Sequence, residues 1–156
     1  MSGELTLKLG AGMPSNLFAF ASRTRTEKVL AVSLAPDDQR TLETMFHQLP
    51  WRLTKAATLA QGLRQAMSGT VPVVLCERDL PGGTWRRLFV ETRDLAHPPR
   101  LIVVSRLADE RLWAEVLNLG GHDVLATPFA ADEVRRVLSY AVDSWRWQVK
   151  NEAKCG

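Results

Sequence analysis

The sequence predicts a doubly wound α/β sandwich, in which helices cover both faces of a five-stranded parallel sheet. The segment from Val71 to Cys76 is apolar throughout, too short for a typical helix and rich in β-branched residues, as in a strand buried on both faces. Strand-like runs alternate with helical patterns from Lys28 to Trp147. Short connections and right-handed crossovers then make the sheet parallel. We expect the strand order 2-1-3-4-5.

The first half of this alternation begins at Lys28. Val29 to Leu34 is a strand run, and Trp51 to Lys55 alternates as an edge strand would. The helix between them opens at Pro36 and carries apolar residues at helical spacing: Leu42, Met45, Phe46 and Leu49. Its acids Asp37 and Asp38 complement the helix dipole, so they require no metal to explain them. The next helix carries Leu59, Leu63 and Met67, and it ends at Ser68-Gly69.

The second half follows the central strand and its turn at Leu80 to Gly83. Leu101 to Ser105 and Val124 to Thr127 read as the fourth and fifth strands, and Gly120-Gly121 caps the helix between them. The apolar residues of the last three helices are, in order, Trp85, Leu88, Phe89 and Leu95; Leu112, Val116 and Leu119; and Val134, Val137, Leu138, Ala141 and Trp145.

We divide the chain into an N-terminal extension (1–27), one α/β domain (28–147) and a polar C-terminal tail (148–156). The extension contains an alternating segment, Glu4 to Leu9, and a short apolar run, Leu17 to Ala21. We favour an extension that docks loosely on the domain. The alternative is an arm that binds a partner or a second copy of the chain.

Composition excludes several classes of function. The net charge is +3, but the arginines are spread over every helix and form no patch for nucleic acid. Neither the two cysteines nor the three histidines show the spacing of metal ligands. No apolar stretch is long enough to span a membrane, and Glu4 and Lys8 interrupt any signal peptide, so we expect a cytoplasmic protein.

One carboxylate marks the candidate site. Glu77 follows the central strand at its carboxyl end, the edge where ligands bind in open α/β sheets. The expected strand order brings the ends of the first and third strands together. Ser33 and Leu34 should therefore face Glu77 across a cleft, with Ser105 and Thr127 alongside.

In these motifs the chain resembles the receiver domains of two-component response regulators, from about Lys28 to Trp147. The matching segments are, in order, Lys28 to Val32 with Pro36, Leu53 to Ala56, Leu80 to Gly82, Ser105, and Gly120 to Phe129. The resemblance implies the flavodoxin-like fold of receiver type. It also implies a cis peptide bond between Thr127 and Pro128.

The chain departs from the family at the positions that carry its chemistry. The resemblance implies a phosphoacceptor Asp where Glu77 stands and an acidic pair for Mg²⁺ where Ser33 and Leu34 stand. It implies a Lys at Thr127 and an aromatic switch residue at Val124. Within this active set, Ser105 alone keeps the side-chain chemistry of the family.

These changes bear on phosphoryl transfer. Phosphorylating a carboxylate requires positive charge on the transferred oxygens, normally from a metal ion and a lysine. Leu34 offers no metal ligand, Ser33 offers a neutral oxygen, and Thr127 carries no charge. We therefore expect Mg²⁺ binding to be lost, no metal site, no catalytic residues and no enzymatic activity.

Two roles remain open for Glu77. We favour a solvated carboxylate with no assigned task, because Glu carries half of a phosphoryl group's charge or less. The alternative is that Glu77 imitates the phosphorylated state, with Ser105 as hydrogen-bond partner and Arg78 or Arg106 as counter-charge. Asp79 lies two residues further into the turn and should point away from the cleft.

The resulting hypothesis is an atypical receiver domain that acts by protein–protein contact without phosphorylation. Its partner would be a signalling protein, either a histidine kinase or an output protein. We expect the domain to bind neither nucleic acid nor a membrane. The main alternative is a conventional response regulator with an unusual phosphoacceptor. An enzyme or nucleotide binder is a third class, which the absence of a Gly-rich phosphate loop after the first strand disfavours.

We also expect a homodimer through the last two helices and the strand between them. Trp113 and Tyr140 are candidate outward aromatics, the kind of side chain that interfaces favour. The alternative is that both rings fold back onto the core.

Overall fold

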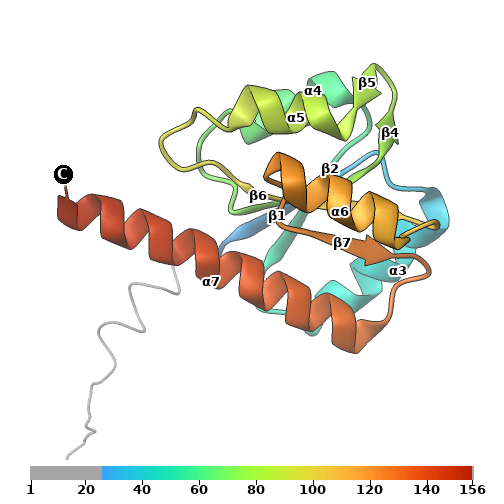
Figure 1. The fold of residues 1–156 in the computed structure, drawn as a ribbon. Helices are drawn as coiled ribbons and strands as arrows, with labels where there is room; N and C mark the ends of the chain where they lie inside the picture. The colour runs from blue at the N-terminus through green and yellow to red at the C-terminus, as the bar shows by residue number, and fades with distance from the viewer. Residues whose placement is uncertain (1–25, 156) are drawn as a thin grey trace, which may run out of the picture.

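The computed structural model describes residues 26–155 and confirms the predicted doubly wound sandwich (Figure 1). Five parallel strands pair in the order β2-β1-β3-β6-β7, which is the expected order 2-1-3-4-5. Their bounds are β1 Lys28–Val32, β2 Arg52–Ala56, β3 Val73–Glu77, β6 Arg100–Ser105 and β7 Asp123–Ala126. The central position of β3 matches the prediction from its apolar run.

Helices cover both faces of the sheet (Figure 1). Their bounds are α3 Pro36–Phe46, α4 Leu59–Ala66, α5 Trp85–Thr92, α6 Glu110–Leu119 and α7 Ala131–Cys155. Helices α3 and α7 contribute to one hydrophobic cluster, and α4, α5 and α6 contribute to the other. Among the described residues, no helix combines the length and the apolar composition that a membrane crossing requires.

The two clusters are divided by the alternation of side chains along each central strand. In β3, Val73 and Leu75 join the α3–α7 side, whereas Val74 and Cys76 join the other. All four are at most 1% exposed. Because successive strand residues point to opposite faces, a strand with no polar residue before its end has to be covered on both sides.

Local signals set the helix boundaries. The Thr58 hydroxyl accepts a hydrogen bond from Gln61 N (3.2 Å) at the start of α4, and Asp109 Oδ1 accepts one from Leu112 N (2.9 Å) at the start of α6. Gly120 ends α6 with φ of 108°, a left-handed conformation that favours glycine.

The predicted turn at Leu80 to Gly83 is present, and it joins a small hairpin in which β4 (Asp79–Leu80) pairs antiparallel with β5 (Gly83–Thr84). The expected tail at 148–156 is helical as far as Cys155, because α7 continues past the sheet (Figure 1). Of the expected extension, Thr26 and Glu27 are described, and residues 1–25 lie outside the described part of the chain.

Candidate functional site

The carboxyl ends of β1, β3 and β6 surround a hollow of about 430 Å³. Of the predicted site residues, Ser33, Glu77 and Ser105 line it, as expected. The remaining lining residues are Ala35, Arg78, Asp79, Arg106 and Leu107. We call this hollow the Glu77 cleft.

The two serines of the Glu77 cleft are held by the backbone around them. Ser33 has φ of 57°, a left-handed conformation that is uncommon for a residue with a Cβ. Its N–H donates to Ala56 O at 2.8 Å, which fixes the end of β1 against β2. Ser105 Oγ accepts a hydrogen bond from Leu107 N at 3.0 Å, and its own proton remains available to a neighbour.

Leu34 and Thr127 do not line the cleft, contrary to expectation. Leu34 is buried in the cluster between the sheet and the α3–α7 layer, because an apolar side chain after β1 gains more from the core than from the cleft. Thr127 is also buried, and its N–H donates to Ser105 O at 3.2 Å. The Thr127–Pro128 bond is cis, as predicted. Val124, which the resemblance places at the family's aromatic switch position, is buried in β7.

A second acidic residue contributes to the electrostatics of the cleft. Asp38 lies on the buried face of α3 with Leu42 and Phe46, and it is 6% exposed. Its Oδ2 is buried and has no hydrogen-bond partner. From the sequence, we assigned Asp38 only to the helix dipole. Its spacing of four and eight residues from Leu42 and Phe46 is the signal that could have placed it on the inner face.

The pKa of Glu77 is raised above its usual value, first by burial and then by the negative charge of Asp38. Arg106 opposes these effects, and Asp79 adds a smaller increase. Asp79 was expected to point away from the cleft, but it lines the cleft, at the start of the β4–β5 hairpin and with most of its side chain exposed. The cleft therefore disfavours the charged form of the carboxylate at its centre.

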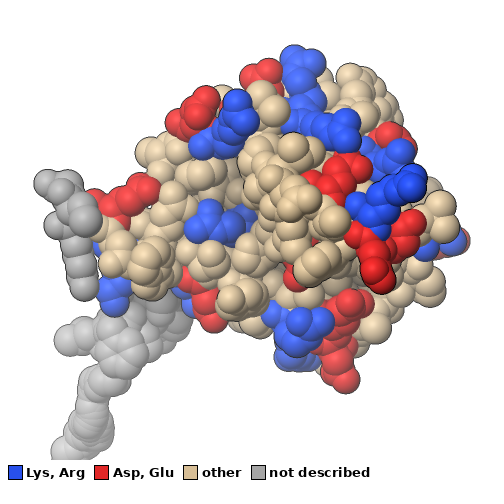
Figure 2. Space-filling view, viewed as in Figure 1, with Lys and Arg blue, Asp and Glu red and all other residues tan. Residues whose placement is uncertain are grey.

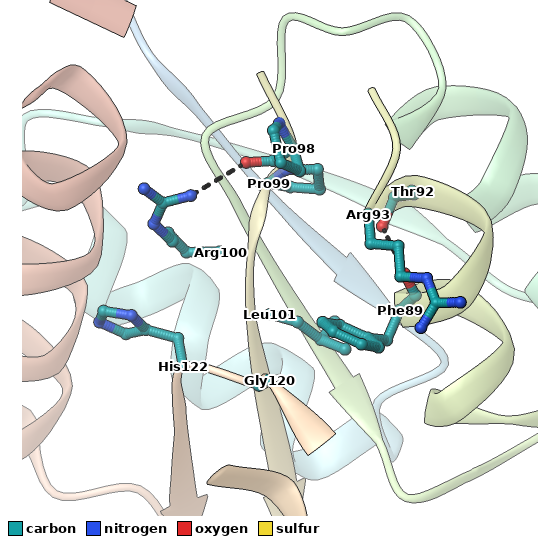
Figure 3. Close-up of a pocket in the computed structure, with 10 residues that line it drawn as sticks. Phe89, Thr92, Arg93, Pro98, Pro99, Arg100, Leu101, Gly120 and His122 are labelled. Carbon is teal, nitrogen blue, oxygen red and sulfur yellow. Dashed lines mark hydrogen bonds between the residues drawn. The ribbon is translucent and has the colours of Figure 1, made fainter. Parts of the chain in front are cut away.

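A second hollow, of about 280 Å³, lies at the opposite edge of the sheet, where β6 and β7 begin (Figure 3). Arg100 is its most prominent polar side chain, but each of its three nitrogens already donates a hydrogen bond within the domain. Its guanidinium donates to Pro98 O (3.3 Å), Ser144 Oγ (3.0 Å) and Ser144 O (3.2 Å). Burial lowers the pKa of the neighbouring His122. We interpret Arg100 as a link between β6 and α7, and we place the candidate site at the Glu77 cleft.

Replacing Glu77 with Gln should stabilise the protein at neutral pH. A carboxyl group whose pKa is raised on folding costs stability above its folded pKa, and this cost disappears below the unfolded value, near 4.5. The stability gained by Glu77→Gln should therefore shrink as the pH falls toward that value. Urea denaturation across this pH range measures it, with Asp94→Asn, at an exposed position, as control. A loss of stability at neutral pH, or a gain that does not vary with pH, would contradict the inference that folding raises the pKa of Glu77.

No family model matches the sequence, and a search of curated proteins found no match. Solved structures do match the fold. A signal receiver domain of an HD domain-containing protein from Pseudomonas fluorescens Pf-5 shares 21% identity and a TM-score of 0.71, over 81% of this chain and 93% of that one. A structure described as a response regulator from Chloroflexus aurantiacus J-10-fl shares 17% identity and a TM-score of 0.66, over 76% of this chain and 99% of that one. The receiver domain dimer of beryllofluoride-activated NtrC4 shares 16% identity and a TM-score of 0.66, over 76% of this chain and 98% of that one. The chain thus has the fold of response regulator receiver domains.

Proposed function

We propose that the chain is an atypical receiver domain that signals by protein–protein contact and is not phosphorylated. The main support is the composition of the Glu77 cleft. Its one central carboxylate is a Glu with a raised pKa, and the positions implied for the family's second metal-binding acid and its lysine are the buried Leu34 and Thr127. Such a cleft has the shape of a receiver site without its charges.

Mg²⁺ is not expected to bind in this cleft. The ion requires near-octahedral oxygen ligands, usually with one or two carboxylates. Asp38 is buried and does not line the cleft, and the other lining carboxylate, Asp79, is exposed and lies 3.9 Å from Arg78. Within residues 26–152, no three His, Cys, Asp or Glu side chains gather into a metal-binding group. Arg78 and Arg106 also line the cleft, and their charges oppose a cation there.

We assign Glu77 no role as an imitation of the phosphorylated state. Such an imitation depends on a full and outward negative charge. Burial and Asp38 both favour the neutral carboxyl form instead. Arg106 is the one counter-charge that favours ionised Glu77, and its effect is smaller than either.

Intact mass after incubation with a small acyl phosphate and Mg²⁺ tests this function. We expect no added phosphoryl group on the wild-type protein or on Glu77→Asp, because a nucleophile of the right length still lacks the charges that stabilise the transferred oxygens. Glu77→Gln serves as control for phosphorylation elsewhere on the chain. A Mg²⁺-dependent gain of one phosphoryl group by wild type or Glu77→Asp, absent in Glu77→Gln, would support the conventional phosphoacceptor instead.

The surface formed by α6, β7 and α7 is the proposed contact surface. Trp113 on α6 is 52% exposed and Tyr140 on α7 is 71% exposed, so neither ring folds back onto the core. A hollow of about 410 Å³ lies beside Trp113 and is also lined by Val124, Glu133 and Arg136. The NtrC4 receiver domain is described as a dimer, and we propose a homodimer for this chain as well.

A protein partner suits the charge distribution better than a nucleic acid. Acidic and basic side chains are interspersed over the face shown in Figure 2. Arg86 of α5 is paired with Glu115 of α6, and Arg87 with Glu91 at 3.1 Å. We propose a signalling protein as partner, either a histidine kinase or an output protein. This role would place the chain in the cytoplasm.

Replacing Trp113 with Ser should weaken the homodimer. Truncating a large aromatic at the centre of an interface typically costs about 2 kcal/mol or more, roughly a thirtyfold increase in Kd. Light scattering over a concentration series measures the change. Val90→Ser on α5 is the matched control, since Val90 is 47% exposed on a different helix. A wild-type protein that stays monomeric at high concentration, or equal effects of both substitutions, would contradict this interface.

A further inference from the structure

The hollow of about 280 Å³ where β6 and β7 begin combines basic and apolar walls (Figure 3). We call it the Arg100 hollow. Its basic lining residues are Arg93, Arg100 and His122, and none of its lining residues is acidic. Its apolar side chains are Phe89, Pro98, Pro99 and Leu101. The hollow lies at the edge of the sheet opposite the Glu77 cleft, so a ligand bound here would be separate from the proposed receiver function.

Arg100 is held in place, but no ion pair with another described residue neutralises its charge. Its three hydrogen bonds go to neutral acceptors, which are Pro98 O, Ser144 Oγ and Ser144 O. A guanidinium has five N–H groups, so two of them remain. Burial lowers the pKa of Arg100, and the charge that opposes this effect belongs to Glu152, whose Oε1 lies 3.0 Å from His97 Nδ1. A half-buried cation in such surroundings favours the addition of an anion.

The other two basic residues lie on either side of the start of β6. His122 lies beside Arg100 on the side of α7, whereas Arg93 comes from the end of α5 (Figure 3). Burial lowers the pKa of His122, and Arg100 adds to this effect against the opposing charge of Asp123. Arg93 is exposed, and its guanidinium forms no hydrogen bond or ion pair within the described part of the chain. Its charge is therefore available at the rim of the hollow.

The apolar wall is closely packed and offers few hydrogen-bond donors. A Cβ at Gly120 would lie 2.5 Å from Phe89 Cζ, so the Phe89 ring lies directly against this glycine. Leu101 is 5% exposed. The hydroxyl of Thr92, also in the wall, already donates to Leu88 O at 2.7 Å. A mainly apolar lining with a few placed polar groups is typical of a site for a small organic ligand.

We propose that the Arg100 hollow binds a small organic anion, a carboxylate attached to an apolar ring. The carboxylate would lie toward Arg100 and His122, and the ring would lie against Phe89 and Leu101. The two remaining N–H groups of Arg100 match the two oxygens of a carboxylate. A phosphate group has more acceptor oxygens than these groups can satisfy. Because Arg100 also holds Ser144, the ligand would contact the residue that joins β6 to α7.

A titration of the full chain with benzoate, followed by NMR of the backbone amides at constant pH and ionic strength, tests this site. We expect saturable shifts at Arg93, Leu101 and Gly121 at millimolar benzoate. Benzamide, which keeps the ring but lacks the charge, should bind several times more weakly. Inorganic phosphate, which keeps a negative charge but lacks the ring, should also bind several times more weakly.

Charge reversal at the rim tests the role of the basic residues without disturbing the core. Arg93→Glu should raise the Kd for benzoate severalfold, because it places a like charge beside the ligand. Arg64→Glu, at an exposed position on α4, is the matched control and should leave the Kd unchanged. Arg100→Gln should abolish binding, and its thermal unfolding shows whether the variant remains folded. The comparison of Arg93→Glu with Arg64→Glu holds whether or not Arg100→Gln folds.

Four results would overturn the proposal. The first is a benzoate titration without saturable shifts in the hollow. The second is equal binding of benzamide, which would show that the basic residues play no part. The third is phosphate bound as tightly as benzoate, which would identify an anion site with no use for an apolar ring. The fourth is an equal effect of Arg93→Glu and Arg64→Glu, which would show only a response to net charge.

Discussion

The burial of β3 on both faces is the constraint on which the rest of the structure depends. Val73 to Cys76 are at most 1% exposed, and burying one such side chain contributes roughly 1.5–3 kcal/mol. A strand of this kind needs a neighbour on each side and a helical layer above and below. The chain meets these requirements by placing β1 and β6 beside it and dividing five helices between the two faces. Glu77 is where the buried run ends, so the same constraint brings a carboxylate to the edge of the sheet.

What the cleft contains is less constrained than its position. The fold requires only that β1, β3 and β6 end together, and a receiver fold is compatible with many side chains at those ends. Here the residue after Ser33 has become part of the core, and Thr127 is buried beside Ser105. The acidic residue that influences Glu77 comes from α3 instead. Its charge raises the pKa of the carboxyl group, which is the opposite of what a bound cation or a nearby lysine would do.

The sequence predicted the fold well, because periodicity and strand length report directly on burial. The five strands, their order and the central place of β3 all follow from apolar runs and short connections. The site was harder to predict, because the side chain of a residue just after a strand can pack into the core or line the cleft. Leu34 packs into the core, whereas Ser33 and Ser105 line the cleft.

The length of α7 was not predicted for a different reason, because the sequence of residues 148–155 shows no continuous apolar face. That part of the helix is supported by local contacts, such as Gln148 Nε2 to Glu152 Oε2 (2.9 Å), and by Glu152 Oε1 at 3.0 Å from His97 Nδ1.

The central claim is that the Glu77 cleft keeps the shape of a receiver site but not its electrostatics. A Mg²⁺ titration followed by NMR tests this claim most directly, with the backbone amides of Ser33, Glu77 and Ser105 as reporters. We predict no saturable shift at these residues up to millimolar Mg²⁺, because half-buried Glu77 and exposed Asp79, with Arg78 and Arg106 beside them, do not offset the dehydration of the ion. Saturable shifts confined to these three residues would contradict it, since they would show that the cleft retains a metal site.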